Sequence, residues 1–337
     1  MATIFHHKQK PKNPQLTPAK RGEIGTRKPP RLPQLRRAPI ATLRSFRLTE
    51  RDMAIVTTVY QYRALTREHI EQLFFSPTSR TRCWERLKLL YHAGYLLRTD
   101  QPHTLSEGRK PFVYWLDKKG AELIAINRGI EFADVQWNPK AHHIGSQFLY
   151  HMLDTNTIRI AILQAAAKQT FVLAQWKDEA TLRKELAADV VMVKKPQGGS
   201  EKTFVVPDDY FELARLESRG RATDIWRLFV EIDRRTVTGQ VSASTQSKHD
   251  WAHKVSAYLS WFHSPVYLRR YQSTGGRVLT VTTGERRAAH LKAITEQAGG
   301  RNRFWFTTFV KATPDAVLSK PIWSVASRDG LYALTAE

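Results

Sequence analysis

The chain has 337 residues, of which 42% are hydrophobic and 25% are charged, so it is long enough for about two domains with buried cores. Its formal net charge of +22 predicts a polyanionic partner, most simply nucleic acid. The sequence has no apolar run near the roughly 18 residues of a membrane-spanning helix, and its single cysteine, Cys83, excludes an intramolecular disulfide and a cysteine-based zinc site.

Residues 1–47 are predicted to form a basic, proline-rich, disordered arm. They hold twelve lysines and arginines against one acid, Glu23, together with seven prolines, and they show neither helical nor alternating periodicity. Such an arm can follow a phosphate backbone or enter a minor groove of DNA. A dispensable solvated tail is the alternative, and an organellar transit peptide is disfavoured because the prolines interrupt an amphipathic helix.

Residues 48–128 have the order of a winged helix-turn-helix domain. Thr49 begins a T-x-x-D capping pattern, and apolar residues follow it at helical spacing. The expected elements are helices over 50–62, about 65–75, about 77–94 and 118–127, and strands over 95–98 and 112–116. The polar loop between the two strands is expected to form the wing, and Leu123 and Ile126 are expected to close the core.

The third helix of this domain is the predicted DNA-reading element. Its basic side chains lie away from the apolar stripe that contains Cys83 and Leu87. The expected DNA contacts, in the major groove and from the wing to the backbone, are Arg80, Arg82, Arg86, Lys88, Arg109 and Lys110. A winged helix used for protein contacts, with a merely solvated basic face, is the alternative.

Residues 129–337 are predicted to form an α/β domain, a sheet flanked by helices on both faces. The expected helices cover 142–168, 180–186, 246–263 and 285–298, and the expected strands cover 171–176, 210–216, 226–232, 278–282, 303–310 and 321–323. Within the long first helix, the apolar positions predicted to face inward are Ile144, Phe148, Met152, Ile158, Ile162 and Leu163.

Three carboxylates are expected to converge at one end of a hairpin built from strands 210–216 and 226–232. A turn near Gly220 sets Asp208 opposite Asp233 and Tyr210 opposite Glu231. Unpaired carboxylates in an apolar strand are costly to bury, and oxygen ligands of this kind suit Mg²⁺ or Mn²⁺. Polar strand ends that simply meet solvent or neighbouring arginines are the alternative.

The order of elements around this hairpin is that of restriction-endonuclease-like nucleases, whose motif is PD…(D/E)-x-K. Pro207-Asp208 and Glu231-Ile232-Asp233 occupy the motif positions here, so an aspartate stands where the motif has its lysine. Lys254 on the following helix can supply an amine from another backbone position. A lysine extending to solvent is the alternative for that residue.

Nine segments, in order, resemble the replication-relaxation family of plasmid and mobile-element proteins, which is similar to mobilisation relaxases of the C class. They span about Leu48 to Trp323 and read LTERDMAIVTTVYQYRALTREHIEQLFF, RLKLLYHAGYL, PFVYWLDKKGAELI, HHIGSQFL, VPDDYFEL, FVEIDRRT, KVSAYLSWF, RVLTVT and PIW. The resemblance implies a winged helix joined to a nuclease-like domain in the bacterial cytoplasm, associated with the nucleoid or a plasmid. It also implies a role in replication initiation or in nicking at a transfer origin.

The residues carried over by the resemblance are His142, His143, Asp208, Glu231, Asp233 and Lys254. From them we expect a catalytic set of Asp208, Glu231, Asp233, Lys254 and His143, with the three carboxylates binding the metal. Adjacent histidines point about 100° apart on a helix, so both cannot comfortably bind one ion.

Two functions are therefore open. The first is a metal-dependent DNA nickase or relaxase that attacks with water and acts on double-stranded DNA. The second is a non-catalytic replication initiator or transcriptional regulator on a degenerate nuclease scaffold. Other replication or mobilisation proteins and a second copy of the chain are possible partners, and RNA binding is a third, weaker alternative supported only by the aromatic content.

Overall fold

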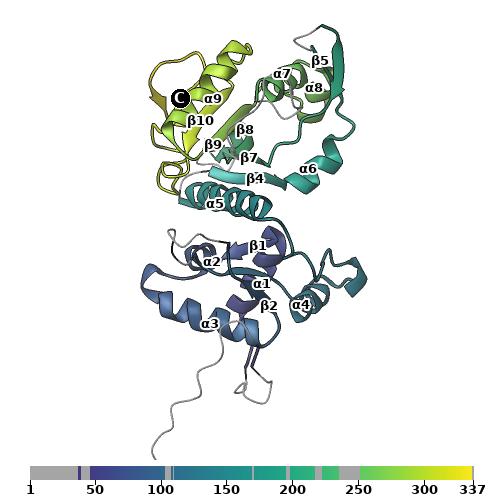
Figure 1. Cartoon of the computed structure of the whole chain (residues 1–337), viewed down its shortest axis with the longest axis vertical. Helices are drawn as coiled ribbons and strands as arrows, with labels where there is room; N and C mark the ends of the chain where they lie inside the picture. The colour runs from purple at the N-terminus through teal and green to yellow at the C-terminus, as the bar shows by residue number, and fades with distance from the viewer. Residues whose placement is uncertain are drawn as a thin grey trace, which may run out of the picture.

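The computed structural model describes residues 37–38, 46–102, 108, 110–168, 171–194, 198–216, 222–234 and 251–335. Most of the predicted N-terminal arm and the wing residue Arg109 lie outside the described residues. The described chain forms two lobes, with one long helix, α5 (Ser146–Lys168), lying between them (Figure 1). Among the described residues no helix is long and apolar enough to cross a membrane.

The N-terminal lobe combines helices with a small antiparallel sheet. Its elements are α1 (Glu50–Tyr62), β1 (Ala64–Thr66), α2 (Arg67–Phe74), the 3-10 helix η2 (Pro77–Ser79), α3 (Arg80–His92), β2 (Leu96–Thr99), β3 (Val113–Leu116), α4 (Lys118–Arg128) and the 3-10 helix η4 (Phe132–Asp134). The strands pair in the order β1-β3-β2. Apolar side chains from α1, α2, α3 and α4 share one core with those of β2 and β3.

Local capping sequences set where the first two helices begin. The Thr49 side chain accepts a hydrogen bond from the Asp52 amide, and the Asp52 carboxylate accepts one from the Thr49 amide. This reciprocal pair satisfies donors that a helix start otherwise leaves open. Thr66 and His69 form the same arrangement at the start of α2. The predicted bounds of the first helix, 50–62, are thereby confirmed.

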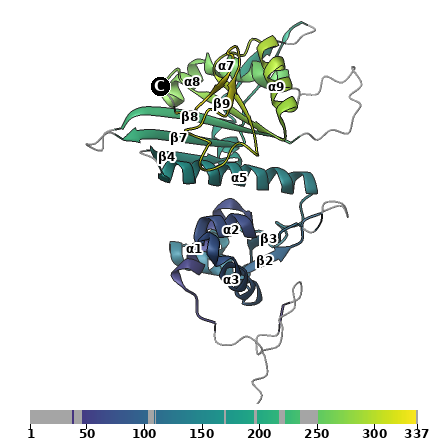
Figure 2. The ribbon, with the colours of Figure 1, turned by 90° about the vertical axis from the view of Figure 1, so that its left-hand side faces the viewer.

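The C-terminal lobe is a mixed sheet with helices on both faces (Figure 2). After α5 its elements are β4 (Phe171–Asp178), α6 (Glu179–Leu186), β5 (Val191–Lys194), β6 (Ser200–Thr203), β7 (Asp209–Leu216), β8 (Ala222–Asp233), α7 (Trp251–Phe262), α8 (Pro265–Tyr271), β9 (Arg277–Thr282), α9 (Glu285–Gln297), β10 (Phe304–Thr308), β11 (Trp323–Val325) and β12 (Leu331–Tyr332). The large sheet has the order β12-β11-β10-β9-β8-β7-β4, in which β8, β9 and β10 run parallel. β5 and β6 form a separate hairpin.

Two apolar cores cover the two faces of the large sheet. On one face α5 packs through Ile158 and Ile162 onto side chains of β7, β8 and β9. On the other face α7, α8 and α9 enclose Phe229 and Tyr210 within an aromatic cluster. The general prediction of an α/β chain whose sheet has helices on both faces is confirmed.

The predicted register of the hairpin is wrong by two residues. Tyr210 pairs with Phe229, not with Glu231, and Asp209 pairs with Val230. Leu216 pairs with Ala222, so the ladder is already offset at its turn end, and a bulge between Ala214 and Leu216 changes the pairing by only one residue. A shift of two keeps every side chain on its expected face. Glu231 therefore extends past the start of β7 and pairs with Thr280 of β9.

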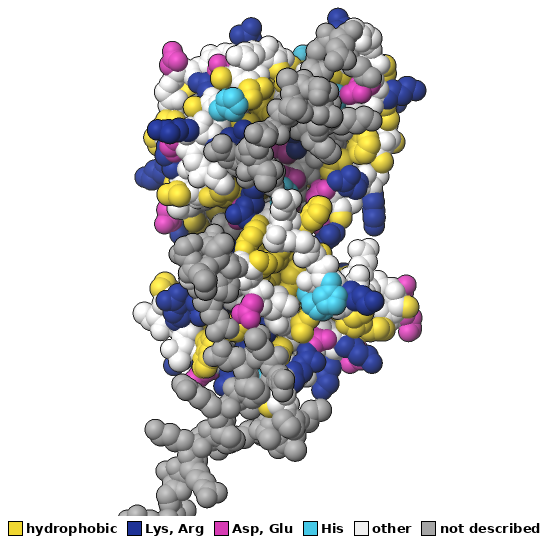
Figure 3. Space-filling view, in the orientation of Figure 1, with side chains coloured by type: hydrophobic (Ala, Val, Ile, Leu, Met, Phe, Trp, Pro, Cys, Tyr) yellow, Lys and Arg dark blue, Asp and Glu magenta, His cyan; other side chains and the backbone are white. Residues whose placement is uncertain are grey.

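The structure also corrects the predicted core positions of two helices. Ile126 is 76% exposed, and Ala121, Ile124 and Ala125 close the N-terminal core in its place. The long helix begins at Ser146, not at His142, and Phe148 near its start is 75% exposed. Figure 3 shows apolar side chains gathering between the two lobes. The short elements β1, β5, β6, α8 and β12 were not predicted, and Leu65 and Thr66, expected to begin the second helix, belong to β1.

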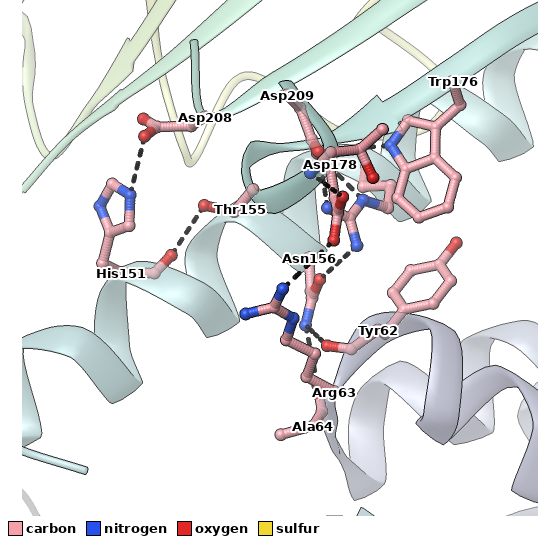
Figure 4. A network of polar contacts seen from close by, with 12 residues as sticks. Tyr62, Arg63, Ala64, His151, Thr155, Asn156, Trp176, Asp178, Asp208 and Asp209 are labelled. Carbon is pink, nitrogen blue, oxygen red and sulfur yellow. Dashed lines mark hydrogen bonds and ion pairs between the residues drawn. The ribbon is translucent and has the colours of Figure 1, made fainter. Parts of the chain in front are cut away.

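A buried polar network joins α5 to both lobes (Figure 4). Arg159 on α5 donates to both oxygens of Asp209 at 3.0 and 2.6 Å, and the two side chains are nearly inaccessible to solvent. The Arg159 guanidinium also donates to Asn156 Oδ1, and the Asn156 amide donates to the carbonyls of Tyr62 and Ala64 in the N-terminal lobe. One ion pair and one amide thus connect the large sheet, α5 and the end of α1.

We expect Asp209→Asn to destabilise the protein by about 3–5 kcal/mol, because it leaves the Arg159 charge buried without its counter-charge. The matched control is Asp315→Asn, since Asp315 pairs with Lys168 where both side chains are well exposed and such pairs contribute at most about 1 kcal/mol. Urea unfolding of both variants measures the difference. Equal losses in the two variants would contradict the role given to the buried pair.

Candidate functional site

Asp208 and Glu231 meet at the carboxyl end of β8, the edge where open α/β sheets commonly bind ligands. Asp208 directly precedes β7, and its amide donates to Val230 O at 3.0 Å. The Ile232 amide in turn donates to Asp208 Oδ2 at 2.7 Å. The side chain of Asp208 is therefore held against the last residues of β8, beside Glu231.

Glu231 is almost completely buried, and both its carboxylate oxygens have partners from α7. Tyr258 Oη donates to Oε1 at 2.6 Å, and Lys254 Nζ forms an ion pair with Oε2. Burial raises the pKa of Glu231 to about 7, with a further contribution from the charge of Asp208, against the opposing effect of Lys254 and Tyr258. Glu231 consequently exchanges its proton near neutral pH.

The third member of the cluster is His151, which comes from α5. Its Nε2 donates to Asp208 Oδ1 at 3.1 Å (Figure 4). Burial alone would raise the pKa of Asp208, but the hydrogen bond from His151 and the charge of Lys254 outweigh it and leave that pKa below its ordinary value. The pKa of His151 is raised, since the contact with Asp208 outweighs its own desolvation.

His151 was missed by the sequence analysis, which selected His143 instead. The ring of His143 lies against that of His142, with centroids 4.0 Å apart, in the turn before α5. The available signal was the polar stripe of His151, Thr155 and Arg159, four residues apart on a helix that is otherwise largely apolar. A polar stripe on an apolar helix face marks side chains that need polar partners.

Asp233 lies at the end of the same strand but has different partners. Arg287 donates to both its oxygens, at 2.9 and 2.8 Å, and Thr282 donates to Oδ2 at 2.7 Å. The predicted set of three convergent carboxylates is therefore not assembled. Among the described residues no three His, Cys, Asp or Glu side chains are grouped as a metal ion would need.

Asp208 and His151 also line a cleft of about 520 Å³ between the lobes. Its walls come from the end of α1, from the segment after η4, from the first half of α5 and from the start of α6. The volume falls within the range of ordinary small-ligand sites. The carboxylate and imidazole thus face a space that a substrate can enter.

The predicted DNA-binding residues of α3 fall into two groups. Arg80 and Arg82 are exposed and Lys88 is half-buried, whereas Arg86 forms a two-point ion pair with Asp52, which is completely buried. On the wing side, Lys110 Nζ donates to Tyr150 Oη at 3.1 Å and lies over that ring.

The protonation of Glu231 predicts a pH-dependent stability. Between its ordinary pKa of 4.5 and its folded pKa of about 7, the folded chain holds a proton that the unfolded chain has released. This stabilisation is complete below pH 4.5 and is lost as the pH rises through 7.

We expect the free energy of unfolding of the wild type, relative to Glu231→Gln, to fall by about 1–3 kcal/mol from pH 4.5 to pH 8. Chemical unfolding at several pH values measures it. Glu285→Gln, at a well-exposed glutamate of α9, is the control that should keep the wild-type profile. Parallel profiles for wild type and Glu231→Gln would contradict the prediction.

Comparison with known proteins supports one assignment. No curated protein and no solved structure matches the chain significantly. A family model described as replication-relaxation matches residues 56–276, well over half of the chain, including β7, β8 and α7. The protein therefore belongs to the replication-relaxation family.

Proposed function

We propose that this protein acts in the replication or mobilisation of a plasmid or mobile element, binds DNA through its N-terminal lobe and cuts one strand with a metal-dependent site. The observation that carries the proposal is the cluster of Asp208, Glu231, Lys254 and His151 at the end of β8. Two carboxylates, an amine and an imidazole can supply metal binding, proton transfer and charge neutralisation in phosphodiester hydrolysis.

The arrangement of elements supports a nuclease of the restriction-endonuclease-like type. The succession α5, β4, β7, β8, α7, β9 is the αβββαβ order of that type, if the small β5-β6 hairpin and α6 are taken as insertions. Asp208 and Glu231 occupy the acidic motif positions. Lys254 reaches Glu231 from α7 and brings an amine to the place that the motif lysine serves.

Mg²⁺ or Mn²⁺ is the proposed cofactor, held by Asp208 and Glu231. Mg²⁺ commonly binds one or two protein carboxylates and completes its shell with water and substrate phosphate. A carboxylate oxygen that accepts one hydrogen bond keeps a second lone pair, so these two side chains fit such an ion. When bound, the ion would polarise the phosphate and lower the pKa of a bound water.

The side chains themselves supply proton transfer and charge neutralisation. Lys254 and His151 are 39% and 34% exposed, so a phosphate can approach both. Glu231 and Asp208, as ligands of the ion, would position the attacking water beside the phosphate. His151, whose pKa is raised, can donate a proton to the leaving oxygen, and the Lys254 ammonium can neutralise charge on the phosphate.

The N-terminal lobe is proposed to be a winged helix that docks α3 on duplex DNA. The order α1, β1, α2, α3, β2, β3 and the β1-β3-β2 sheet are those of a winged helix, with α3 as the recognition helix. Arg80 and Arg82 at its exposed start are available to phosphates or base edges. The net charge of +22 favours this partner.

A non-catalytic DNA-binding protein is the second candidate, and one observation favours it. All four oxygens of Asp208 and Glu231 already contact groups of the protein itself. A cluster that satisfies itself in this way can serve only to stabilise the end of the sheet. Such a protein would bind DNA as an initiator or regulator without cutting it.

We expect the protein to nick supercoiled plasmid DNA that carries its own genetic neighbourhood, in the presence of Mg²⁺ or Mn²⁺. Asp208→Asn, Glu231→Gln and Lys254→Met should each slow nicking by about 100-fold or more, because each removes a group that contacts the reacting phosphate, water or metal ion. Open-circle product on agarose gels measures it.

The control is Asp315→Asn. Asp315 is exposed and far from the cluster in sequence, so this variant should nick normally. Nicking that survives all three substitutions would place the chemistry elsewhere. If the wild type binds DNA tightly but does not nick it with either metal ion, the result would support the second candidate, a non-catalytic DNA-binding protein.

Substitutions of Arg82 and Arg86 are expected to have different effects, the first on DNA affinity and the second on the stability of the N-terminal lobe. Arg82→Ala should lower duplex affinity and reduce the slope of log affinity against log salt by about one, because one phosphate contact is lost, with unfolding unchanged. Arg86→Ala should destabilise the lobe by about 1–3 kcal/mol, since it leaves the buried Asp52 carboxylate without its counter-charge, with only the hydrogen bonds from Thr49. Fluorescence anisotropy and urea unfolding check the two variants, and the reverse pattern would refute the assignment.

A further inference from the structure

The wall of the interdomain cleft carries two exposed apolar side chains, Ile144 in the turn before α5 and Phe148 in its first turn. They are four residues apart, and the half-buried Met152, which packs against the core, continues the same side of α5 along the cleft. Phe148 is 75% exposed and Ile144 is 38% exposed. A contiguous exposed apolar surface of this kind marks a binding site more often than chance exposure does.

The opposite wall supplies aromatic and amide groups. Tyr60 at the end of α1 and Trp137 after η4 line the cleft with part of their surface accessible. Gln61, Gln136 and Asn138 line it as exposed amides. Flat aromatic faces stack on nucleobases, and side-chain amides hydrogen-bond to base edges. The combination suits a planar heterocycle with donors and acceptors on its rim.

A strained arginine stands at the same cleft. Arg63 has φ 63° and ψ −43°, a region that non-glycine residues rarely adopt and that costs of order 1–3 kcal/mol. Its side chain is 60% exposed and its Nη2 lies 3.6 Å from Asp178 Oδ2 (Figure 4). Arg63 and Asp178 both line the cleft, so the exposed guanidinium can contact a phosphate there as well as Asp178.

We propose that this cleft binds one or two unpaired nucleotides of a DNA strand, with their bases on the Phe148 wall and a phosphate at Arg63. The inference rests on the proposed DNA-cutting function, because Asp208 and His151 line the same cleft. The volume of about 520 Å³ accommodates a ligand of that size but not a duplex. The winged lobe would hold duplex DNA while the cleft holds the separated strand beside the carboxylates.

The test compares two single-stranded oligonucleotides of equal length and charge, one of thymidines and one with abasic sites at its centre. Binding is measured by fluorescence anisotropy without metal and with chelator, so that cutting plays no part. The wild type should bind the thymidine strand about 5- to 100-fold more tightly, because stacking depends on the base. Phe148→Ala should reduce this preference to near one while leaving the abasic affinity unchanged.

Two further variants complete the experiment. Ile126→Ala removes an equally exposed apolar side chain of α4, outside the cleft, and should keep the preference. Arg63→Gly should weaken binding of both oligonucleotides several-fold while thermal stability holds or rises, because glycine relieves the backbone strain. A purely structural Arg63 would instead lose stability without losing affinity.

The outcomes distinguish this inference from the proposed nicking activity. A base preference that Phe148→Ala abolishes supports the cleft assignment whether or not the protein nicks. Equal affinity of the wild type for both oligonucleotides would overturn it even if nicking is observed. A wild type that sediments as a dimer, becomes monomeric with Phe148→Ala and keeps its oligonucleotide affinity would assign the surface to a second copy and likewise overturn it.

Discussion

The ion pair between Arg159 and Asp209 determines how the rest of the site is assembled. Both groups are buried, so the pair is stable only if α5, the start of β7 and the end of α1 keep one arrangement. The same helix carries His151 two turns earlier, at about 12 Å along its axis. Adjacent aspartates are thus held by two residues of α5: Asp209 by Arg159 in the interior, and Asp208 by His151 at the cleft. Because both contacts come from the same helix, the Arg159–Asp209 ion pair also orients the His151–Asp208 hydrogen bond at the cleft.

The cluster also separates the pKa values of two neighbouring acids. Asp208 has a lowered pKa because its hydrogen bonds and the nearby Lys254 favour the carboxylate, whereas burial raises the pKa of Glu231 to about 7. Two carboxyl groups whose environments shift them in opposite directions are the usual basis of acid–base pairs in enzymes. At neutral pH Asp208 is a permanent anion and Glu231 a group that exchanges its proton.

The sequence predicted best those features that depend on a few neighbouring residues. The capping box of Thr49 and Asp52 located the first helix because its hydrogen bonds span only three residues. The register of β7 on β8 depends on where the chain turns between them, which alternation of side chains does not reveal. The β5-β6 hairpin was missed although Gly198 and Gly199, both with positive φ, precede its second strand. Two such glycines between short alternating runs are a recognised hairpin signal.

Three of the residues predicted for the site lie together, whereas Asp233 and His143 have other neighbours. Asp208, Glu231 and Lys254 do lie together, since strand alternation and the following helix fix their side of the sheet. His151 was not predicted because its partner is 57 residues away, and only the packing of α5 brings them together. Ile144 and Phe148 were expected in the core and are exposed, whereas Met152 packs against a core cluster as expected. The expectation arose because periodicity shows that apolar residues share a face. It does not show what covers that face.

Asp233 and Lys254 differ in role within the proposed nuclease site. Arg287 and Thr282 bind Asp233, which stands where the proposed nuclease motif would have its lysine, so that position serves the packing of α9 onto the sheet. The amine instead arrives from α7, one helix later in the chain, and reaches the same carboxylate. Electrostatic stabilisation depends on where a charged atom lies and not on which backbone position carries it. An aspartate at the motif lysine position is therefore compatible with catalysis as long as the Lys254 ammonium stays beside Glu231.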